Sequence, residues 1–255
     1  MNLLALPAFA DNYIWMLHDG ARAVVVDPGD AAPVQAALDT LQLQLQSILV
    51  THRHPDHVAG VDELRHRLQG SVYGPALEAV PQPCQGMNDG DTVQVLGHTF
   101  EVMHVPGHTL GHIAFVQRDA VASPLLFCGD TLFSAGCGRM FEGTPAQMSH
   151  ALARLAALPD DTQVCCTHEY TLANLRFALA VEPGNAAVLS HQALCLAQRQ
   201  AGQPTLPSSI AQERLINPFL RCSEPAVVAA ALHQGATDSD PVSVFAALRK
   251  WKNHF

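Results

Sequence analysis

The sequence predicts an α+β protein in which a domain of mixed strands and helices, residues 1–168, precedes a smaller α-helical domain, residues 169–255. Short apolar runs closed by Gly, Pro or Asp fill the first part, a pattern typical of strands that end in turns. From about Thr171 the chain is rich in Ala and Leu at helical spacing, with Pro204 and Pro207 as breaks. This change of pattern separates the two predicted domains.

The individual elements follow from the same patterns. Besides the apolar N-terminal segment, residues 1–15, the predicted strands are Ala23–Val26, Ile48–Val50, Thr92–Leu96, Phe100–Val105, Ile113–Val116, Leu125–Cys128 and Gln163–Cys166. Gly97-His98 is the expected turn of a hairpin. The predicted helices are Val58–Leu68, Pro145–Leu158, Thr171–Val181, Asn185–Gln200, Ile210–Leu215, Pro225–His233 and Val242–Lys250.

The composition excludes several classes of protein. With 48% hydrophobic residues the chain can build a core, and its net charge of −9 argues against binding to nucleic acid. No apolar run approaches the roughly 18 residues that span a membrane, and the N-terminus lacks the basic region of a signal peptide. The seven cysteines include no CxxC pair, which favours thiols in a reducing compartment. We therefore expect a cytoplasmic monomer that binds neither nucleic acid nor membranes.

Histidine is unusually common, because its 14 residues equal Lys plus Arg. The densest cluster is Thr51-His52-Arg53-His54-Pro55-Asp56-His57. Side chains two apart in extended backbone point the same way, so His52 and His54 can share one ion. Pro55 keeps His54 extended, and Asp56 and His57 can then turn toward a second ion. Imidazole and carboxylate suit Zn²⁺, and also iron or manganese; the alternative is a polar surface loop.

Three further residues strengthen the metal hypothesis. His108, Asp130 and His168 each follow a predicted strand, where a rigid sheet holds functional groups in place. A lone histidine is more often structural, so their joint occurrence after the first cluster carries the argument.

The order HxHxDH, His108, Asp130, His168 resembles the metallo-β-lactamase superfamily. The blocks THRHPDH, VPGHTLGH, FCGDTLF, GCGRMFEGT, THEYT and the closing LRKWKNHF resemble, more closely, the glyoxalase II (hydroxyacylglutathione hydrolase) family. The resemblance spans essentially the whole chain. It implies an αββα sandwich followed by a helical domain that contributes to a glutathione site.

The resemblance also implies a binuclear metal site. One divalent ion, most simply Zn²⁺ with Fe or Mn as alternatives, would be held by His52, His54 and His108. The other would be held by Asp56, His57 and His168, with Asp130 and a hydroxide bridging both. The two carboxylates offset two of four positive charges, and the remaining excess favours deprotonation of bound water.

The implied reaction is hydrolysis of S-D-lactoylglutathione, an S-2-hydroxyacylglutathione, to D-lactate and glutathione in methylglyoxal detoxification. The bridging hydroxide would attack the thioester carbonyl. Alternatives are a persulfide dioxygenase or a different thioesterase of the same fold, and a zinc-binding protein without turnover.

The family's glutathione site maps onto Arg139, Phe141, Tyr170, Arg249 and Lys252. The only two lysines, Lys250 and Lys252, stand at the C-terminal end, where a solvated helix end is the simpler explanation without the resemblance. Some family members have Lys and Tyr at positions 139 and 141, so Phe141 lacks a phenolic hydroxyl for glutathione.

Four other residues have weaker assignments. We expect Asp27 and Thr51 to orient ligand histidines, with a turn role for Asp27 as an equal alternative. We expect His112 to support a ligand residue or to lie in the core, rather than to bind metal itself. A nucleophilic role for Cys137 is not favoured.

Overall fold

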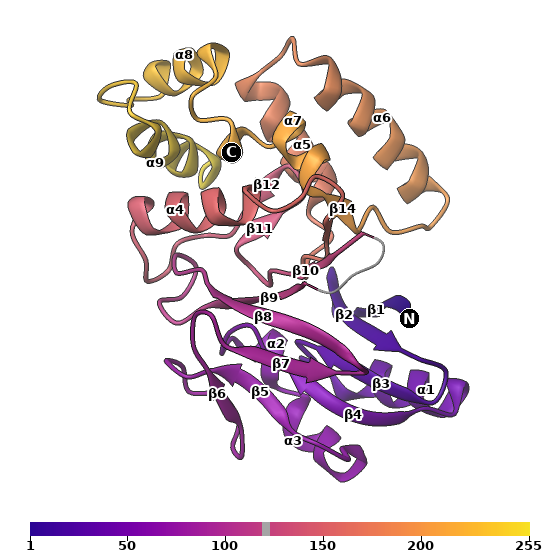
Figure 1. Ribbon diagram of the computed structural model, residues 1–255. Coiled ribbons are helices and arrows are strands. Elements are labelled where there is room, and N and C mark those ends of the chain that lie inside the picture. Colours follow the sequence, from indigo (N-terminus) through magenta and orange to yellow (C-terminus); the bar gives the residue numbers. More distant parts are fainter. Residues whose placement is uncertain (119–122) are drawn as a thin grey trace. The chain divides into compact units, whose positions relative to one another are not determined.

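The computed structural model describes residues 1–118 and 123–255, which divide into two compact units (Figure 1). Unit 1 comprises Met1–His104 and Leu110–Gly129, and unit 2 comprises Val105–Thr109 and Asp130–Phe255. The predicted domain boundary after residue 168 lies inside unit 2 and stays a prediction.

Unit 1 contains a six-stranded sheet in the order β1 to β6. Its strands are β1 (Asn2–Ala8), β2 (Asn12–His18), β3 (Arg22–Val26), β4 (Gln44–Leu49), β5 (Val72–Pro75) and β6 (Gln85–Met87). The first three strands pair antiparallel and the others parallel. Helix α1 (Ala31–Leu41) connects the parallel strands β3 and β4 and buries Val34 and Leu38 in the core of this sheet. Such a parallel crossover leaves the loop after β4 at a sheet end, where sites are commonly built.

A second group of antiparallel strands completes unit 1. They are β7 (Thr92–Val95), β8 (His98–His104), β9 (Ile113–Gln117) and β10 (Leu125–Phe127). The β7–β8 hairpin turns at Leu96-Gly97, one residue earlier than predicted, because Val95 pairs with His98. Leu96 and Gly97 have φ of 52° and 81°, the left-handed pair that a tight two-residue hairpin needs.

The predicted helix Val58–Leu68 is wrong as a single element. The chain forms α2 (Pro55–Val58), α3 (Val61–Leu64) and a 3₁₀ turn at Arg65–Arg67. The break falls at Gly60, whose N–H donates to the carbonyl of Pro28 at 3.0 Å instead of to the preceding helical turn. A Cβ at Gly60 would lie 2.6 Å from the nitrogen of Ala31, so close packing on the neighbouring loop sets the bend.

Unit 2 is mostly helical. Its helices are α4 (Pro145–Ala156), α5 (Thr171–Val181), α6 (Ala186–Gln200), α7 (Ile210–Ile216), a 3₁₀ helix (Pro218–Leu220), α8 (Pro225–His233) and α9 (Pro241–Lys252). Its strands form two short pairs, β11 (Leu132–Phe133) with β12 (Gly136–Cys137) and β13 (Gln163–Val164) with β14 (Ser208–Ser209). The predicted bounds of α5 and α8 agree with the structure, because Pro225 and the Ala/Leu spacing mark them clearly.

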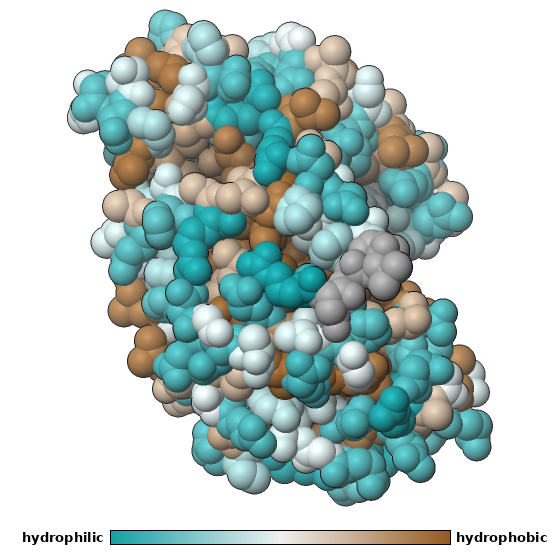
Figure 2. All heavy atoms as spheres, in the orientation of Figure 1, coloured by the Kyte–Doolittle hydropathy of each residue, from teal (hydrophilic) through white to brown (hydrophobic). Residues whose placement is uncertain are grey.

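The visible face is largely hydrophilic, with scattered apolar residues (Figure 2). Among the described residues, no helix combines the length and apolar character that crossing a membrane requires.

The first prediction concerns the core of unit 1. Phe100 in β8 is fully buried and stacks on Phe127 with ring centroids 5.9 Å apart. We expect Phe100→Ala to lower the free energy of unfolding by about 3–5 kcal/mol, because it leaves a cavity. Denaturant unfolding measures this loss. The control Leu41→Ala, at a position 41% exposed, should change it by less than about 0.5 kcal/mol. Equal effects of the two substitutions would contradict this core assignment.

Candidate metal centre

The predicted ligand cluster of unit 1 lies on the loop that follows β4. The buried strand β4 ends at Leu49, and the chain then runs through Thr51 and His52 into α2. Pro55 stands at the start of α2, and His54 before it is extended with φ −63° and ψ 145°, as predicted. His52 and His57 are fully buried, whereas His54 is half-buried. The loop therefore holds its imidazoles between a rigid strand and a short helix.

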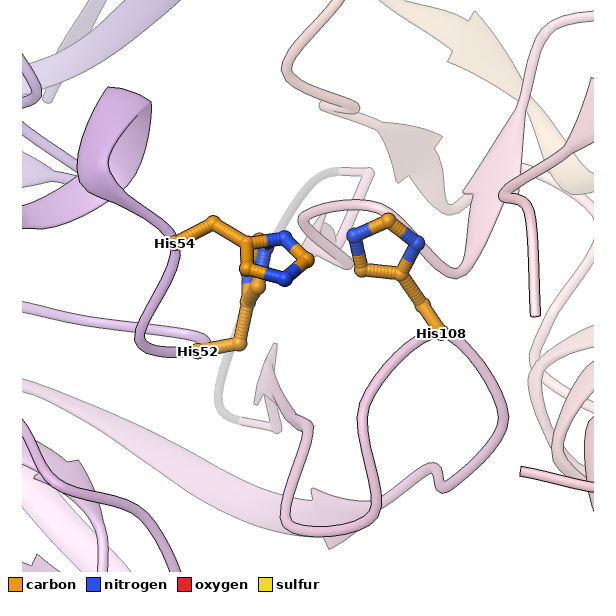
Figure 3. Close-up of side chains that lie close together, drawn as sticks. All are labelled: His52, His54 and His108. Carbon is orange, nitrogen blue, oxygen red and sulfur yellow. Dashed lines mark hydrogen bonds between the residues drawn. The ribbon is translucent and has the colours of Figure 1, made fainter. Parts of the chain in front are cut away.

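His52 and His54 present adjacent ring nitrogens. The Nε2 atom of His52 lies 3.0 Å from Nδ1 of His54, with the rings nearly perpendicular (Figure 3). The hydroxyl of Thr51 donates to Oδ2 of Asp27 at 2.7 Å and lies 3.1 Å from Nδ1 of His52. Because the hydroxyl proton goes to Asp27, the hydroxyl oxygen accepts the Nδ1 proton of His52. The lone pair of His52 is then on Nε2, on the side of His54.

His57 and Asp56 form the second donor pair of this loop. Nδ1 of His57 lies 3.1 Å from Oδ2 of Asp27, and Nε2 lies 3.5 Å from Oδ2 of Asp56. The negative charge of Asp27 favours a proton on Nδ1 of His57 and therefore a lone pair on Nε2. Asn12 donates to the same oxygen of Asp56 at 3.1 Å and limits its movement.

Asp27 serves both roles considered from the sequence. Its φ of 53° places it in the left-handed region, as a turn residue. Its carboxylate is 2% exposed and accepts from the N–H of Thr51 at 2.7 Å, besides the contacts above. A single carboxylate thus sets the ring tautomers of His52, through Thr51, and of His57 directly.

Unit 2 brings together the three other predicted ligands. Nε2 of His108 lies 3.3 Å from Oδ2 of Asp130, and Nε2 of His168 lies 3.4 Å from Oδ1 of the same carboxylate. His108 lies on a loop (Figure 3), and its Nδ1 atom faces the main-chain carbonyl of Arg139 at 2.8 Å. That carbonyl can only accept, so the proton is on Nδ1 and the lone pair of His108 is directed at the carboxylate.

These donor sets fit divalent metal ions. Two ligands of one tetrahedral zinc lie about 3.3 Å apart, given bonds of about 2.0–2.2 Å. The four donor pairs within the units are separated by 3.0, 3.3, 3.4 and 3.5 Å. Once its proton is elsewhere, each of these nitrogens and oxygens can supply a lone pair to one divalent ion at this spacing. The buried imidazole and carboxylate groups in both units therefore suit divalent metals.

Glycine is required where the backbone approaches these ligands. A Cβ at Gly138 would lie 1.9 Å from the carbonyl oxygen of Asp130, and one at Gly129 would lie 2.3 Å from the hydroxyl of Thr51. Gly129 also has φ of 47°. No side chain fits at either position without displacing a residue of the site.

Two residues support the loop of candidate ligands that follows β4, which we call the metal loop. The sequence predicted a role for one of them, His112, but not for the other, Glu78. His112 is buried and stacks on His52 at 4.6 Å, which agrees with the expected supporting or core role. Glu78 was not predicted: its carboxylate accepts from the N–H of Arg53 at 2.6 Å and of Gly111 at 3.1 Å. Glu78 thus connects the metal loop at Arg53 to Gly111, which is distant in sequence. Local sequence patterns cannot predict a contact of this kind.

Three predicted substrate residues lie beside the ligands of unit 2. Tyr170 stacks on His168 with ring centroids 4.6 Å apart and remains 37% exposed. Phe141 lies edge-on to His108 at 5.3 Å and is 63% exposed, and Arg139 is exposed. Two exposed aromatic rings therefore lie next to His108 and His168.

The two cations of α9 that are predicted to bind substrate, Arg249 and Lys252, have different environments. Arg249 is buried, donates to the carbonyl of Cys137 at 2.9 Å and to Oδ1 of Asn253 at 3.2 Å, and stacks over Phe219. Lys252 lies over the ring of Phe177, and burial, with a smaller contribution from Arg249, lowers its pKa to about 8. Burial raises the pKa of the Cys137 thiol, which argues against a nucleophilic thiolate there.

The second prediction tests the orienting carboxylate. Asp27→Asn keeps the side-chain volume but replaces one carboxylate oxygen with an amide N–H₂, which cannot accept a hydrogen bond. The rings of His52 and His57 then lose the group that orients them and can turn. We expect metal affinity, measured by chelator competition, to fall roughly 10- to 100-fold. The control Asp30→Asn, at the N-cap of α1 on the same loop, should leave the affinity unchanged, because Asn caps a helix as well as Asp. Equal affinities for all three proteins would rule out the orienting role.

Comparisons with known proteins agree with this geometry. The family model described as "Metallo-beta-lactamase superfamily" matches residues 9–168, and that described as "Hydroxyacylglutathione hydrolase C-terminus" matches residues 169–255. The hydroxyacylglutathione hydrolase of Albidiferax ferrireducens is 57% identical over 255 residues and covers 100% of both chains.

Solved structures show the same fold. The crystal structure of ETHE1 from Myxococcus xanthus matches with a TM-score of 0.66 at 25% identity, covering 99% of this chain and 98% of that chain. The crystal structure of TTHA1623 in a di-iron-bound form matches with a TM-score of 0.53 at 29% identity, covering 66% and 92%. The predicted fold class is confirmed. The chain therefore belongs to the metallo-β-lactamase superfamily and, within it, to the hydroxyacylglutathione hydrolase family.

Proposed function

We propose that this protein is a thioester hydrolase that cleaves S-D-lactoylglutathione, an S-2-hydroxyacylglutathione, to D-lactate and glutathione, in methylglyoxal detoxification. The observation that carries the proposal is family membership along the whole chain together with a complete donor set. The persulfide dioxygenase alternative is not favoured, because full-length relatives at 51–57% identity are hydroxyacylglutathione hydrolases.

We assign the metal ligands as two sets with a shared carboxylate. His52, His54 and His108 would hold one ion, and Asp56, His57 and His168 the other. The two oxygens of Asp130 face His108 and His168 separately, one residue from each set, which supports a bridging role. The pairs His52–His54 and His57–Asp56 are likewise neighbours within their set. Zn²⁺ suits these ligands best, and Fe or Mn would also be accepted.

The ions would supply Lewis acidity, which makes water nucleophilic near neutral pH and stabilises negative charge on the carbonyl oxygen. The protein's part is to hold the donors in place. Asp27 and Thr51 fix the tautomers of His52 and His57, and the Arg139 carbonyl fixes that of His108. The leaving thiol of glutathione has a pKa of about 8.5, so the reaction needs no strong general acid.

The substrate's glutathione part would be bound by Arg139, Phe141, Tyr170, Arg249 and Lys252. Arg249 already donates to Cys137 and Asn253, so we assign the larger electrostatic part to Lys252. Phe141 cannot donate the hydrogen bond of a tyrosine, which would cost about 1 kcal/mol of binding. The seven cysteines are thiols, six of them buried, which supports a reducing compartment such as the cytoplasm. We also propose a monomer.

The third prediction is the test of the function. The purified protein loaded with Zn²⁺ should hydrolyse S-D-lactoylglutathione, followed as loss of the thioester absorbance, and a chelator should stop it. Asp130→Ala should lose bound metal and activity together, because it removes the shared carboxylate. The control Asp161→Ala, at an exposed position, should change neither. A metal-loaded wild-type protein without turnover would refute the proposal in favour of a metal-binding protein.

The fourth prediction uses the pKa of Lys252, which burial lowers to about 8. Below that pH the ammonium is charged and attracts an anionic substrate; above it the charge is lost. KM should therefore be low below pH 8 and rise above it. Lys252→Met should raise KM at pH 7 roughly 10-fold, the value of a charged hydrogen bond, and should remove this pH dependence.

Lys250→Met is the matched control, since Lys250 is an exposed lysine of the same helix. Its KM should follow the wild-type curve. If the KM of Lys252→Met shows the same pH dependence as the wild type, Lys252 does not bind substrate. It would then act only as a cation at the C-terminal end of helix α9.

A further inference from the structure

We infer that four buried side chains from the helical part of unit 2 hold the β11–β12 hairpin and thereby position the ligands His108, Asp130 and His168. We call Asn174, Glu213, Asn217 and Arg249 the hairpin clamp. The inference rests on the proposed metal site and names positioning residues for it. None of the four side chains needs to touch substrate for this role.

The clamp binds main-chain groups of five consecutive residues, 133–137. Asn217 donates to the carbonyls of Phe133 at 3.1 Å and Gly136 at 2.9 Å. Asn174 donates to the carbonyl of Ser134 at 2.9 Å, and Arg249 to that of Cys137 at 2.9 Å. Glu213 accepts from the N–H of Ala135 at 2.7 Å. Each residue of the hairpin turn thus contacts a side chain that lies far along the sequence.

The clamp side chains are deeply buried. Glu213 and Asn217 have no exposed surface, and Asn174 and Arg249 are each 3% exposed. Burial raises the pKa of Glu213, against the effect of its hydrogen bonds from Ser208, Ala135 and Asn217. A buried carboxylate is tolerated only when such donors surround it. The hairpin amide is one of these donors, so hairpin and helices stabilise each other.

The hairpin needs outside support. It pairs only Leu132 with Cys137 and Phe133 with Gly136, too few residues for a stable isolated hairpin. Ala135 has φ of 54°, a conformation that costs free energy for a residue with a Cβ. A Cβ at Gly136 would lie 2.5 Å from the amide nitrogen of Asn174, so the turn is packed directly against the clamp.

The hairpin is linked to all three proposed ligands of unit 2, directly or through the residues that flank it. Asp130 precedes β11 by two residues, and the N–H of Gly138 donates to the carbonyl of Thr131 at 3.2 Å, which extends the hairpin pairing toward Asp130. Beyond β12, the carbonyl of Arg139 faces Nδ1 of His108 at 2.8 Å. The ring of Phe133 packs edge-on against His168, with centroids 5.7 Å apart. A shift of the hairpin would therefore move three ligands at once.

Asn217→Ser is the most direct test. Serine keeps the cap that Asn217 provides for the N–H of Phe219, but its hydroxyl is too short to reach the hairpin carbonyls. We expect metal affinity of the apo-protein, measured by chelator competition, to fall roughly 10- to 100-fold, as for other residues that support ligands. In the loaded enzyme, kcat should fall with little change in KM.

Asn185→Ser is the matched control. Asn185 also caps a helix and also donates to a carbonyl, that of Leu215 at 3.0 Å, but it does not contact the hairpin. It should keep the metal affinity and kcat of the wild-type protein, even if its stability falls. Equal metal affinities of Asn217→Ser, Asn185→Ser and the wild type would overturn the inference.

A second variant covers the case in which Asn217→Ser does not fold. Asn174→Ala removes one hydrogen bond to the hairpin on a helix that favours alanine, and we expect a metal affinity lower by roughly 5-fold or more, the value of one such bond. Unchanged affinity would again overturn the inference. Because metal affinity is measured without substrate, a wild-type protein that binds metal but does not hydrolyse the thioester would refute the proposed function and leave this test valid.

Discussion

The central constraint on this structure is that imidazole nitrogens and carboxylate oxygens face one another at 3.0 to 3.5 Å in both units. A metal ion can bind between these atoms only if their lone pairs point toward it, so the protein must hold the rings from outside. In unit 1 the carboxylate of Asp27 does so: it lies 3.1 Å from Nδ1 of His57 and accepts the proton of the Thr51 hydroxyl, whose oxygen faces Nδ1 of His52. In unit 2 the Arg139 carbonyl plays that part for His108. The metal centre is therefore as much a property of these supporting contacts as of the ligands.

The two units solve this problem by different means. The metal loop of unit 1 is short and local: a buried strand, one proline and one carboxylate position four proposed ligands within six residues. In unit 2 the ligands are far apart in sequence, and a two-stranded hairpin with little stability of its own must bring their surroundings together. The hairpin receives its missing hydrogen bonds from buried polar side chains. These lie on α5, on α7 and at its C-terminal end, and on α9.

Local pattern was enough to predict the parts of the fold that local interactions determine. Helix α5, the strand before the metal loop and the extended His54 before Pro55 were predicted because spacing and proline geometry act over a few residues. The helix Val58–Leu68 failed because Gly60 bonds to Pro28, and helix α1 was not recognised. The candidate ligands were readable from residue type and order. The contacts of Glu78 with Arg53 and of Glu213 with Ala135 were not, because these partners lie 25 or more residues away.

The hairpin clamp also bears on how this protein can be divided. The segment that matches the metallo-β-lactamase model ends at residue 168 and includes every assigned metal ligand, yet all four clamp side chains lie beyond it. A chain shortened at that boundary would keep its donors and lose what orders three of them. The two family segments are thus separable in sequence but interdependent in the assembly of the metal centre.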